Sequence, residues 1–196
     1  MRLLSVALIA LFLSVVVAQN PPTASSKSQT PAVESMQRKL DRIQQNGARA
    51  KPAPMTTTFT EEEVNAYLAS GRVKLPEGVQ SVRLAGTPGV ISGVSRVNFD
   101  QVNASRRNSN PLLGMFRGSH EVAVTTHARG SGGQGIVHVD SVTLDQVEVP
   151  QFVLQLYVDR YLKPKYPNLG IDSRFQLPDH IDSATVGDHK LMVTQK

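Results

Sequence analysis

The stretch IVHVDSVTLDQVEVPQFVLQLYVDRYLK, residues 136–163, decides the fold class, because it joins a strand pattern directly to a helix pattern. In residues 136–149 the apolar side chains recur mostly at every second position, as in a strand with one buried face. The spacing lengthens to three residues at two points, so the apolar side changes face twice. A flat strand cannot bury such a set, and we therefore expect bulges or strong coiling in this part of the sheet.

Pro150 opens the second half of this stretch, and we expect a helix over residues 151–163 that stops before Pro164. Apolar side chains cover most of the circumference of this helix. A helix that is apolar nearly all round is buried on more than one side. We therefore expect it in the concave side of a curved sheet, where it is either a plain core helix or one wall of an apolar groove.

Alternating segments separated by turn residues fill most of the remaining chain. Short turns between neighbouring strands are typical of an antiparallel sheet. We expect an α+β fold in which a long, strongly coiled antiparallel sheet wraps around one or two helices, after a disordered N-terminal tail. The expected strands cover residues 72–75, 79–85, 90–102, 119–129, 136–149, 181–186 and 190–195.

A capping box marks the first helix of this domain. Thr60 is the expected N-cap and Glu63 follows three residues later, while Phe59 and Val64 can form a hydrophobic staple. Gly71 is suited to end the helix. These roles account for the acidic cluster at residues 61–63 without a metal or catalytic site.

The N-terminus has the pattern of a secretory signal peptide over residues 1–18. Arg2 is followed by an apolar run from Leu3 to Val17 that two serines interrupt, and small residues end at Ala18. This run is shorter than the roughly 20 residues of a transmembrane helix. We expect cleavage after Ala18 and export to the periplasm or cell envelope. A retained N-terminal anchor is the alternative.

Residues 19–58 are expected to be a disordered basic tether with a short amphipathic helix over residues 31–46. Residues 1–58 hold seven Lys or Arg against two acids, whereas residues 59–196 hold 14 of each. The neutral part lacks the basic excess of a nucleic-acid-binding domain, so we expect no nucleic-acid partner. The helix of the tether either contributes little, touches anionic lipid, or packs on the domain. We place a single domain at residues 59–196.

Chemical motifs are sparse. The chain has no Cys, which excludes disulfides, thiolate metal sites and a cysteine nucleophile. No nucleophile–base pair can be named, and we expect neither an enzyme nor a cofactor. His127 should face His138 across the hairpin at residues 130–135, with Asp140 on the same face. Such a trio could bind zinc, but we expect surface histidines and no metal site.

An apolar segment lies between cations in residues 106–117, and we consider it a candidate membrane-contact loop. It either folds back onto the core as a short helix or exposes an apolar tip whose arginines meet lipid phosphates. The residues concerned are Arg106, Arg107, Leu112, Leu113, Met115, Phe116 and Arg117.

The order of motifs suggests a family. The helix FTEEEVNAYLAS (residues 59–70) precedes the long strands, followed by SVTLDQVEVPQFVLQLYVDRYL (141–162) and FQLPDHIDSATVGDHKLMVT (175–194). This pattern, with its Val149-Pro150 and Leu177-Pro178 steps and a final hairpin at 181–195, resembles the LmeA-like phospholipid-binding proteins and the YceB-like envelope proteins, near the tubular lipid-binding superfamily. The resemblance implies that residues 59–196 wrap a sheet around a helix and hold lipid along the groove.

We therefore expect an exported envelope protein that binds phospholipid or another apolar ligand between sheet and helix, with the basic tail near anionic membrane. A structural or interaction protein with a filled core is the alternative. The expected groove-lining residues are Phe152, Val153, Leu156 and Tyr157 from the helix and Val122, Val124, Val137 and Val139 from the strands.

Overall fold

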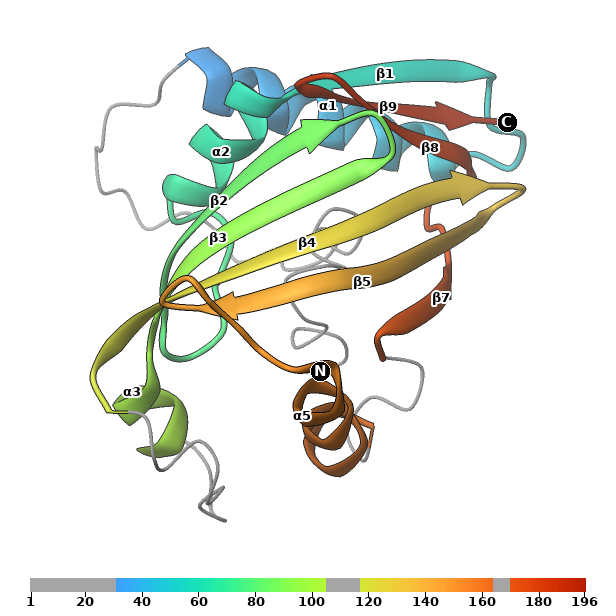
Figure 1. The fold of residues 1–196 in the computed structure, drawn as a ribbon. Coiled ribbons are helices and arrows are strands. Elements are labelled where there is room, and N and C mark those ends of the chain that lie inside the picture. Colours follow the sequence, from blue (N-terminus) through green and yellow to red (C-terminus); the bar gives the residue numbers. More distant parts are fainter. Residues whose placement is uncertain (1–30, 105–116, 164–169) are drawn as a thin grey trace.

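One antiparallel sheet organises the computed structural model, which describes residues 31–104, 117–163 and 170–196 (Figure 1). The fold is α+β as expected, and the nine-stranded sheet does not close into a barrel. Its strands are β1 (Met55–Thr60), β2 (Val79–Thr87), β3 (Val90–Asn98), β4 (Ser119–Ser131), β5 (Gln134–Leu144), β6 (Val147–Glu148), β7 (Asp172–Gln176), β8 (Ile181–Gly187) and β9 (Lys190–Gln195).

The sheet has two parts that meet at the end of β4. Strands β2 to β5 form a meander, and β1, β9 and β8 form a second group. Arg129 and Gly130 of β4 pair with Thr185 and Ala184 of β8. The β2–β3 turn also reaches the second group, since the Gly89 N–H donates to the Val186 carbonyl at 3.0 Å. The sheet therefore bends back on itself at this end.

The two phase changes in residues 136–149 have separate causes. Thr125 pairs with Ser141 and Thr126 with Val139, so Asp140 is the extra residue of a β-bulge. The second change is a turn rather than a bulge, because Asp145 and Gln146 have φ values of 48° and 68° and end β5. The expected single strand is therefore a bulged strand followed by a hairpin to β6.

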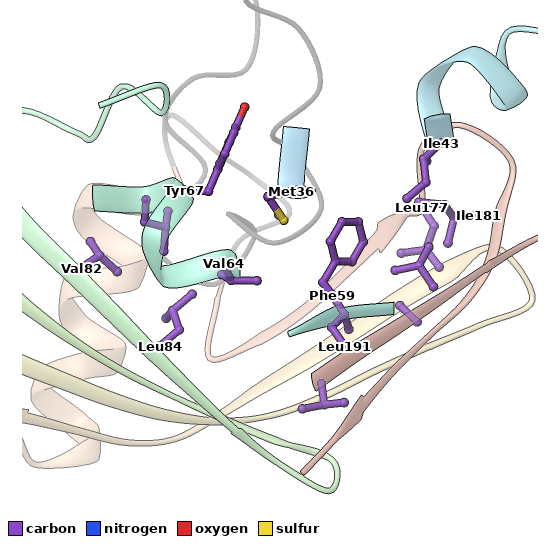
Figure 2. Close-up of a cluster of buried hydrophobic side chains, with 14 of the residues drawn as sticks. Met36, Ile43, Phe59, Val64, Tyr67, Val82, Leu84, Leu177, Ile181 and Leu191 are labelled. Carbon is purple, nitrogen blue, oxygen red and sulfur yellow. The ribbon is translucent and has the colours of Figure 1, made fainter. Parts of the chain in front are cut away.

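The main core lies between the sheet and two helices, α1 (Pro31–Gly47) and α2 (Glu61–Ala69) (Figures 1 and 2). The α1 side chains Val33, Met36 and Ile43 are buried in the same cluster as Phe59. The rest of this cluster is Val64, Tyr67, Leu68, Val82, Leu84, Leu177, Ile181, Ala184, Val186, Leu191 and Val193.

Residues 31–58 are not a tether, which corrects the domain boundary expected at residue 59. The helix expected at 31–46 is present as α1, but its apolar face is part of the core, and residues 55–60 form the edge strand β1 beside β9. A buried polar contact strengthens this attachment: the Asn46 Nδ2 donates to Gln195 Oε1 at 3.1 Å. Residues 1–30, with the expected signal peptide, lie outside the described residues.

Other element boundaries also differ from expectation. Residues 72–75 form no strand, and residues 99–102 lie in helix α3 (Phe99–Ala104) rather than in β3. The Asn98 Oδ1 accepts from the Gln101 N–H at 3.1 Å, which favours a helix start at this point. Strands β1 and β7 were not expected. None of the helices in the described ranges is long and apolar enough to cross a membrane.

Candidate functional site

The helix after Pro150 consists of α5 (Gln151–Tyr157) and the π-helical turn η2 (Val158–Leu162). Among its described side chains, Leu154 and Val158 pack against residues of β4 and β5. Val158 is buried in a small cluster with Val139 and Ile171, and Leu154 is partly buried against the same cluster. The Val149 N–H donates to the Val142 carbonyl at 2.8 Å, which fixes where the chain leaves the sheet and enters the helix.

The expectation that this helix is buried on several sides is wrong. Phe152 is 75% exposed and Leu156 is 49% exposed, so neither lines a groove between helix and sheet. Because the helix uses residues 154 and 158 for packing, side chains at 152 and 156 point to the opposite side. Val153 and Tyr157 are half-buried at the flanks.

The expected strand residues are divided between two environments. Val139 is buried under the helix and Val124 packs partly against the same cluster, so the sheet does bring these two residues to the helix. Val137 is also buried, but it lies between Ala128 of β4 and Ser173 of β7. Val122 is half-buried opposite Leu144.

An apolar strip of half-buried side chains runs along β4 and β5 next to the helix. It consists of Val122 and Val124 on β4 and their direct partners Leu144 and Val142 on β5. Directly opposed residues of neighbouring strands share one face of a sheet. The strip is thus a continuous apolar surface, of which Val124 and Val142 pack, like Leu154 of the helix, against the buried cluster of Val139, Val158 and Ile171.

The main core, by contrast, is filled. A cavity of about 30 Å³ lies among residues of α2, β2, β8 and β9, including Val64, Leu84, Val186 and Leu191. This volume is close to the room needed for one water molecule, far below that of an acyl chain.

His127 and His138 each pair with a different carboxylate. His127 is opposite His138, as expected, and Asp140 is on the same face. His127 Nδ1 lies 2.7 Å from Asp140 Oδ1, and His138 Nδ1 lies 2.7 Å from Asp172 Oδ1. The hydrogen bond with Asp172 raises the pKa of His138 above its usual value. Within the described ranges, no three His, Asp or Glu side chains are placed to hold a metal ion.

Most of the expected membrane-contact loop cannot be placed, because residues 106–116 lie outside the described ranges. Arg117 is exposed at the start of the next described segment. Its carbonyl oxygen lies 2.8 Å from His120 Nε2, while His120 Nδ1 lies 2.5 Å from Asp145 Oδ2. These contacts fix the backbone at the base of the loop.

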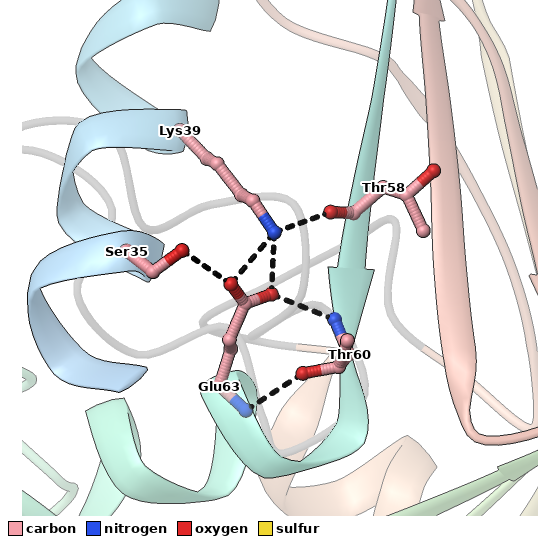
Figure 3. A network of polar contacts seen from close by, with 5 residues as sticks. All are labelled: Ser35, Lys39, Thr58, Thr60 and Glu63. Carbon is pink, nitrogen blue, oxygen red and sulfur yellow. Dashed lines mark hydrogen bonds and ion pairs between the residues drawn. The ribbon is translucent and has the colours of Figure 1, made fainter. Parts of the chain in front are cut away.

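Sequence reasoning missed one polar network, which joins α1 to α2 (Figure 3). Lys39 Nζ lies 2.6 Å and 2.7 Å from the two carboxylate oxygens of Glu63 and donates to the Thr58 carbonyl at 2.7 Å. Burial raises the pKa of Glu63, but hydrogen bonds from Lys39, Ser35 and the Thr60 N–H outweigh it and lower that pKa. The network holds two helices and β1 together and is structural.

The expected capping box is part of this network. The Glu63 N–H donates to Thr60 Oγ1 at 3.2 Å, and the Thr60 N–H donates to Glu63 Oε2 at 2.8 Å. The spacing of Thr60 and Glu63 was a sufficient signal for the cap. No sequence pattern linked Lys39 to Glu63, because the two residues are 24 positions apart.

No known family model, curated protein or solved structure matches this chain. A function must therefore be inferred from the geometry of the strip and the helix.

Proposed function

We propose that this chain is an exported cell-envelope protein that binds phospholipid or another apolar ligand between the apolar strip and the helix α5–η2. The observation that carries the proposal is the strip itself: four aliphatic side chains on two paired strands stay half-buried beside an apolar helix. Ligand sites for apolar molecules are lined mainly by apolar side chains, as this strip is.

The proposed site has two apolar walls, one on the sheet and one on the helix. The strip supplies Val122, Val124, Val142 and Leu144, and the helix supplies Val153 and Leu154, which are also half-buried. An acyl chain between these walls would gain about 0.8 kcal/mol for each methylene group that it removes from water. The strip lies on strands whose register is fixed by hydrogen bonds, so the site is largely pre-formed.

Two further observations support the location and the ligand class. The apolar run at Leu3–Val17 is typical of a secretory signal peptide, which supports export. The order of motifs along the chain resembles that of phospholipid-binding envelope proteins. The helix of the proposed site is the one that follows the Val149-Pro150 step of that pattern.

Native mass spectrometry of the purified protein tests the proposal. We expect a co-purifying lipid in the parent protein and its loss in Val142→Trp, because the indole would occupy the ligand space. Val94→Trp is the matched control, since Val94 is 42% exposed on the opposite face of the sheet. It should keep the lipid.

A protein with a filled core and a structural or interaction role is the second candidate, favoured by the small cavity in the main core. In a packed interface Val142→Trp would overfill the site and cost about 1–3 kcal/mol. Absence of lipid from the parent protein together with strong destabilisation of Val142→Trp would support this second role and reject the lipid site.

A further inference from the structure

Three exposed apolar side chains lie on β6 and α5, one before and two after the Val149-Pro150 step, and we call them the apolar tip. Val147 is 70% exposed, Phe152 75% and Leu156 49%. We propose that this apolar tip, made of Val147, Phe152 and Leu156, inserts into the surface of an anionic phospholipid bilayer. The inference rests on the proposed function in one respect: a protein that binds phospholipid has to obtain it from a membrane.

The tip arises from the way the helix packs. Leu154 and Val158 face the sheet, so Phe152 and Leu156, which are four residues apart, share the outward side. Val147 precedes the helix on the short strand β6. In Figure 1, α5 lies at the end of the molecule remote from β1 and β9. The helix that carries Phe152 and Leu156 therefore lies away from the part of the sheet that packs on α1 and α2.

Cationic side chains follow the tip on the next helical turn. Arg160 is four residues after Leu156 and is exposed, and no ion pair joins it to an acidic side chain of the described chain segments. Lys163 is also exposed at the same end and pairs with Asp159 at 2.6 Å. Apolar residues at one end of the outward side and the exposed guanidinium of Arg160 at the other suit insertion below the phosphates with Arg160 at their level.

The size of the tip favours a bilayer over a protein partner. Its three side chains expose on the order of 300 Å² of apolar surface, a size at which patches are often functional. A stable protein–protein interface buries about 800 Å² on each partner. A peripheral membrane contact, in contrast, needs only a few inserted apolar side chains and a cation near anionic lipid.

Vesicle flotation with the purified full chain tests the inference. The probes are vesicles of phosphatidylcholine mixed with phosphatidylglycerol and vesicles of phosphatidylcholine alone. We expect Phe152→Ser/Leu156→Ser to weaken binding to the anionic vesicles about tenfold or more. Arg160→Gln should weaken it several-fold on the anionic vesicles and have little effect on the neutral ones.

The matched control is Val94→Ser/Met192→Ser, which removes two exposed apolar side chains from other strands, β3 and β9. It should bind as the parent does. Because Phe152 is 75% exposed, Phe152→Ser alone should fold and show a partial loss, even if the double variant does not fold.

Unchanged binding by the tip variants would overturn the inference and leave vesicle adhesion to other parts of the chain, such as the basic residues before position 58. If the parent protein proves to be oligomeric, dissociation of the tip variants without a change in flotation would also overturn the inference, because the tip would then be a protein interface. Co-purifying lipid reports separately on the proposed ligand site: a tip variant that keeps its lipid but floats as well as the parent rejects only the membrane contact.

Discussion

Asp179 has a buried carboxylate oxygen in the turn that precedes β8. It lies with His180 in a tight turn in which both residues have positive φ, 53° and 57°, and the Ile181 N–H donates to the Pro178 carbonyl at 3.0 Å. Asp179 Oδ2 is buried and lacks a hydrogen-bond partner in the described structure. Burial raises the pKa of this carboxyl, so the ionised form opposes folding.

Asp179→Asn should therefore stabilise the protein at neutral pH. Asn has no charge to bury and tolerates positive φ. Solvent screening at this partly exposed side chain limits the expected gain in free energy of unfolding to about 0.5 kcal/mol at pH 7. Since a raised pKa means that the native carboxyl protonates readily, the gain should shrink as the pH falls toward about 4.

Urea denaturation at both pH values measures this gain, and Asp188→Asn is the control because its side chain is 74% exposed. Equal or lower stability of Asp179→Asn at pH 7 would show that the buried carboxylate does not destabilise the folded protein.

At the scale of elements, α1 shows how an expected tether becomes part of the core. Isolated helices of this length are marginal in water, so its helical state depends on packing. Met36 and Ile43 are 7% and 4% exposed against the core. The Lys39–Glu63 ion pair then orients α1 against α2.

Met36→Ala should lower the free energy of unfolding by about 2–3 kcal/mol, because it removes a buried side chain and leaves a cavity. Arg38→Ala, on the exposed side of the same helix with its side chain 71% exposed, should change stability by less than about 0.5 kcal/mol. Equilibrium denaturation of both variants distinguishes a core helix from a tether, for which the two substitutions would have similar small effects.

Helix α2 also protects an edge of the sheet. Leu84 of the edge strand β2 donates its N–H to Asn65 Oδ1 at 2.8 Å, and its carbonyl accepts from Asn65 Nδ2 at 2.7 Å. The Gly86 N–H donates to Glu61 Oε2 at 3.0 Å. These side chains take the place of a further strand, and such coverage prevents pairing between sheet edges of different molecules.

Asn65→Leu should leave the backbone groups of Leu84 without these partners. We expect a loss of about 1–2 kcal/mol in free energy of unfolding and faster aggregation on storage. Thermal melts and light scattering measure the two effects. Stability and scattering equal to those of the parent would mean that water replaces the amide at no cost.

At the scale of the whole molecule, histidine–carboxylate pairs join segments that are distant in sequence. His189 of the β8–β9 turn lies 2.8 Å from Glu61 at the start of α2, and His120 pairs with Asp145. Hydrogen bonds to these carboxylates raise the pKa of both histidines. The pKa of Glu61 is lowered, since bonds from His189 and Gly86 outweigh its burial, and the His120 bond lowers that of Asp145.

These shifts favour a slightly higher stability near pH 6 than near pH 8.5. The histidine contribution is complete below the unfolded value of about 6.5 and is lost as the pH rises through the higher folded pKa values. The carboxylate contribution is complete above about 4.5 and is lost as the pH falls through the lower folded values. We expect a higher melting temperature near pH 6 than near pH 8.5, by a small amount because the pairs are exposed.

His189→Gln and His120→Gln should each flatten this dependence, whereas His180→Gln, which is in none of these pairs, should not. A melting temperature that rises from pH 6 to pH 8.5 would show that these histidine–carboxylate pairs do not govern the pH dependence of stability.

The sequence by itself determined the features that depend on local interactions. The capping box of Thr60 and Glu63, the α1 helix limits near Pro31 and Gly47, and the pairing of His127 with His138 follow from spacing and turn chemistry within a few residues. The sequence predicted bulges or strong coiling in residues 136–149, because a side-chain period of two makes any slip visible in the positions of the valines, and a bulge is present in β5.

Only the tertiary structure decided which apolar faces meet. It made residues 31–47 a core helix, paired β1 with β9, and left Phe152 and Leu156 exposed on a helix expected to be buried. Apolar periodicity shows that a face can be buried, but the partner of that face depends on contacts between segments far apart in the chain. For the helix α5–η2 the sheet offered one surface, so Leu154 and Val158 took it, and Phe152 and Leu156 stayed exposed.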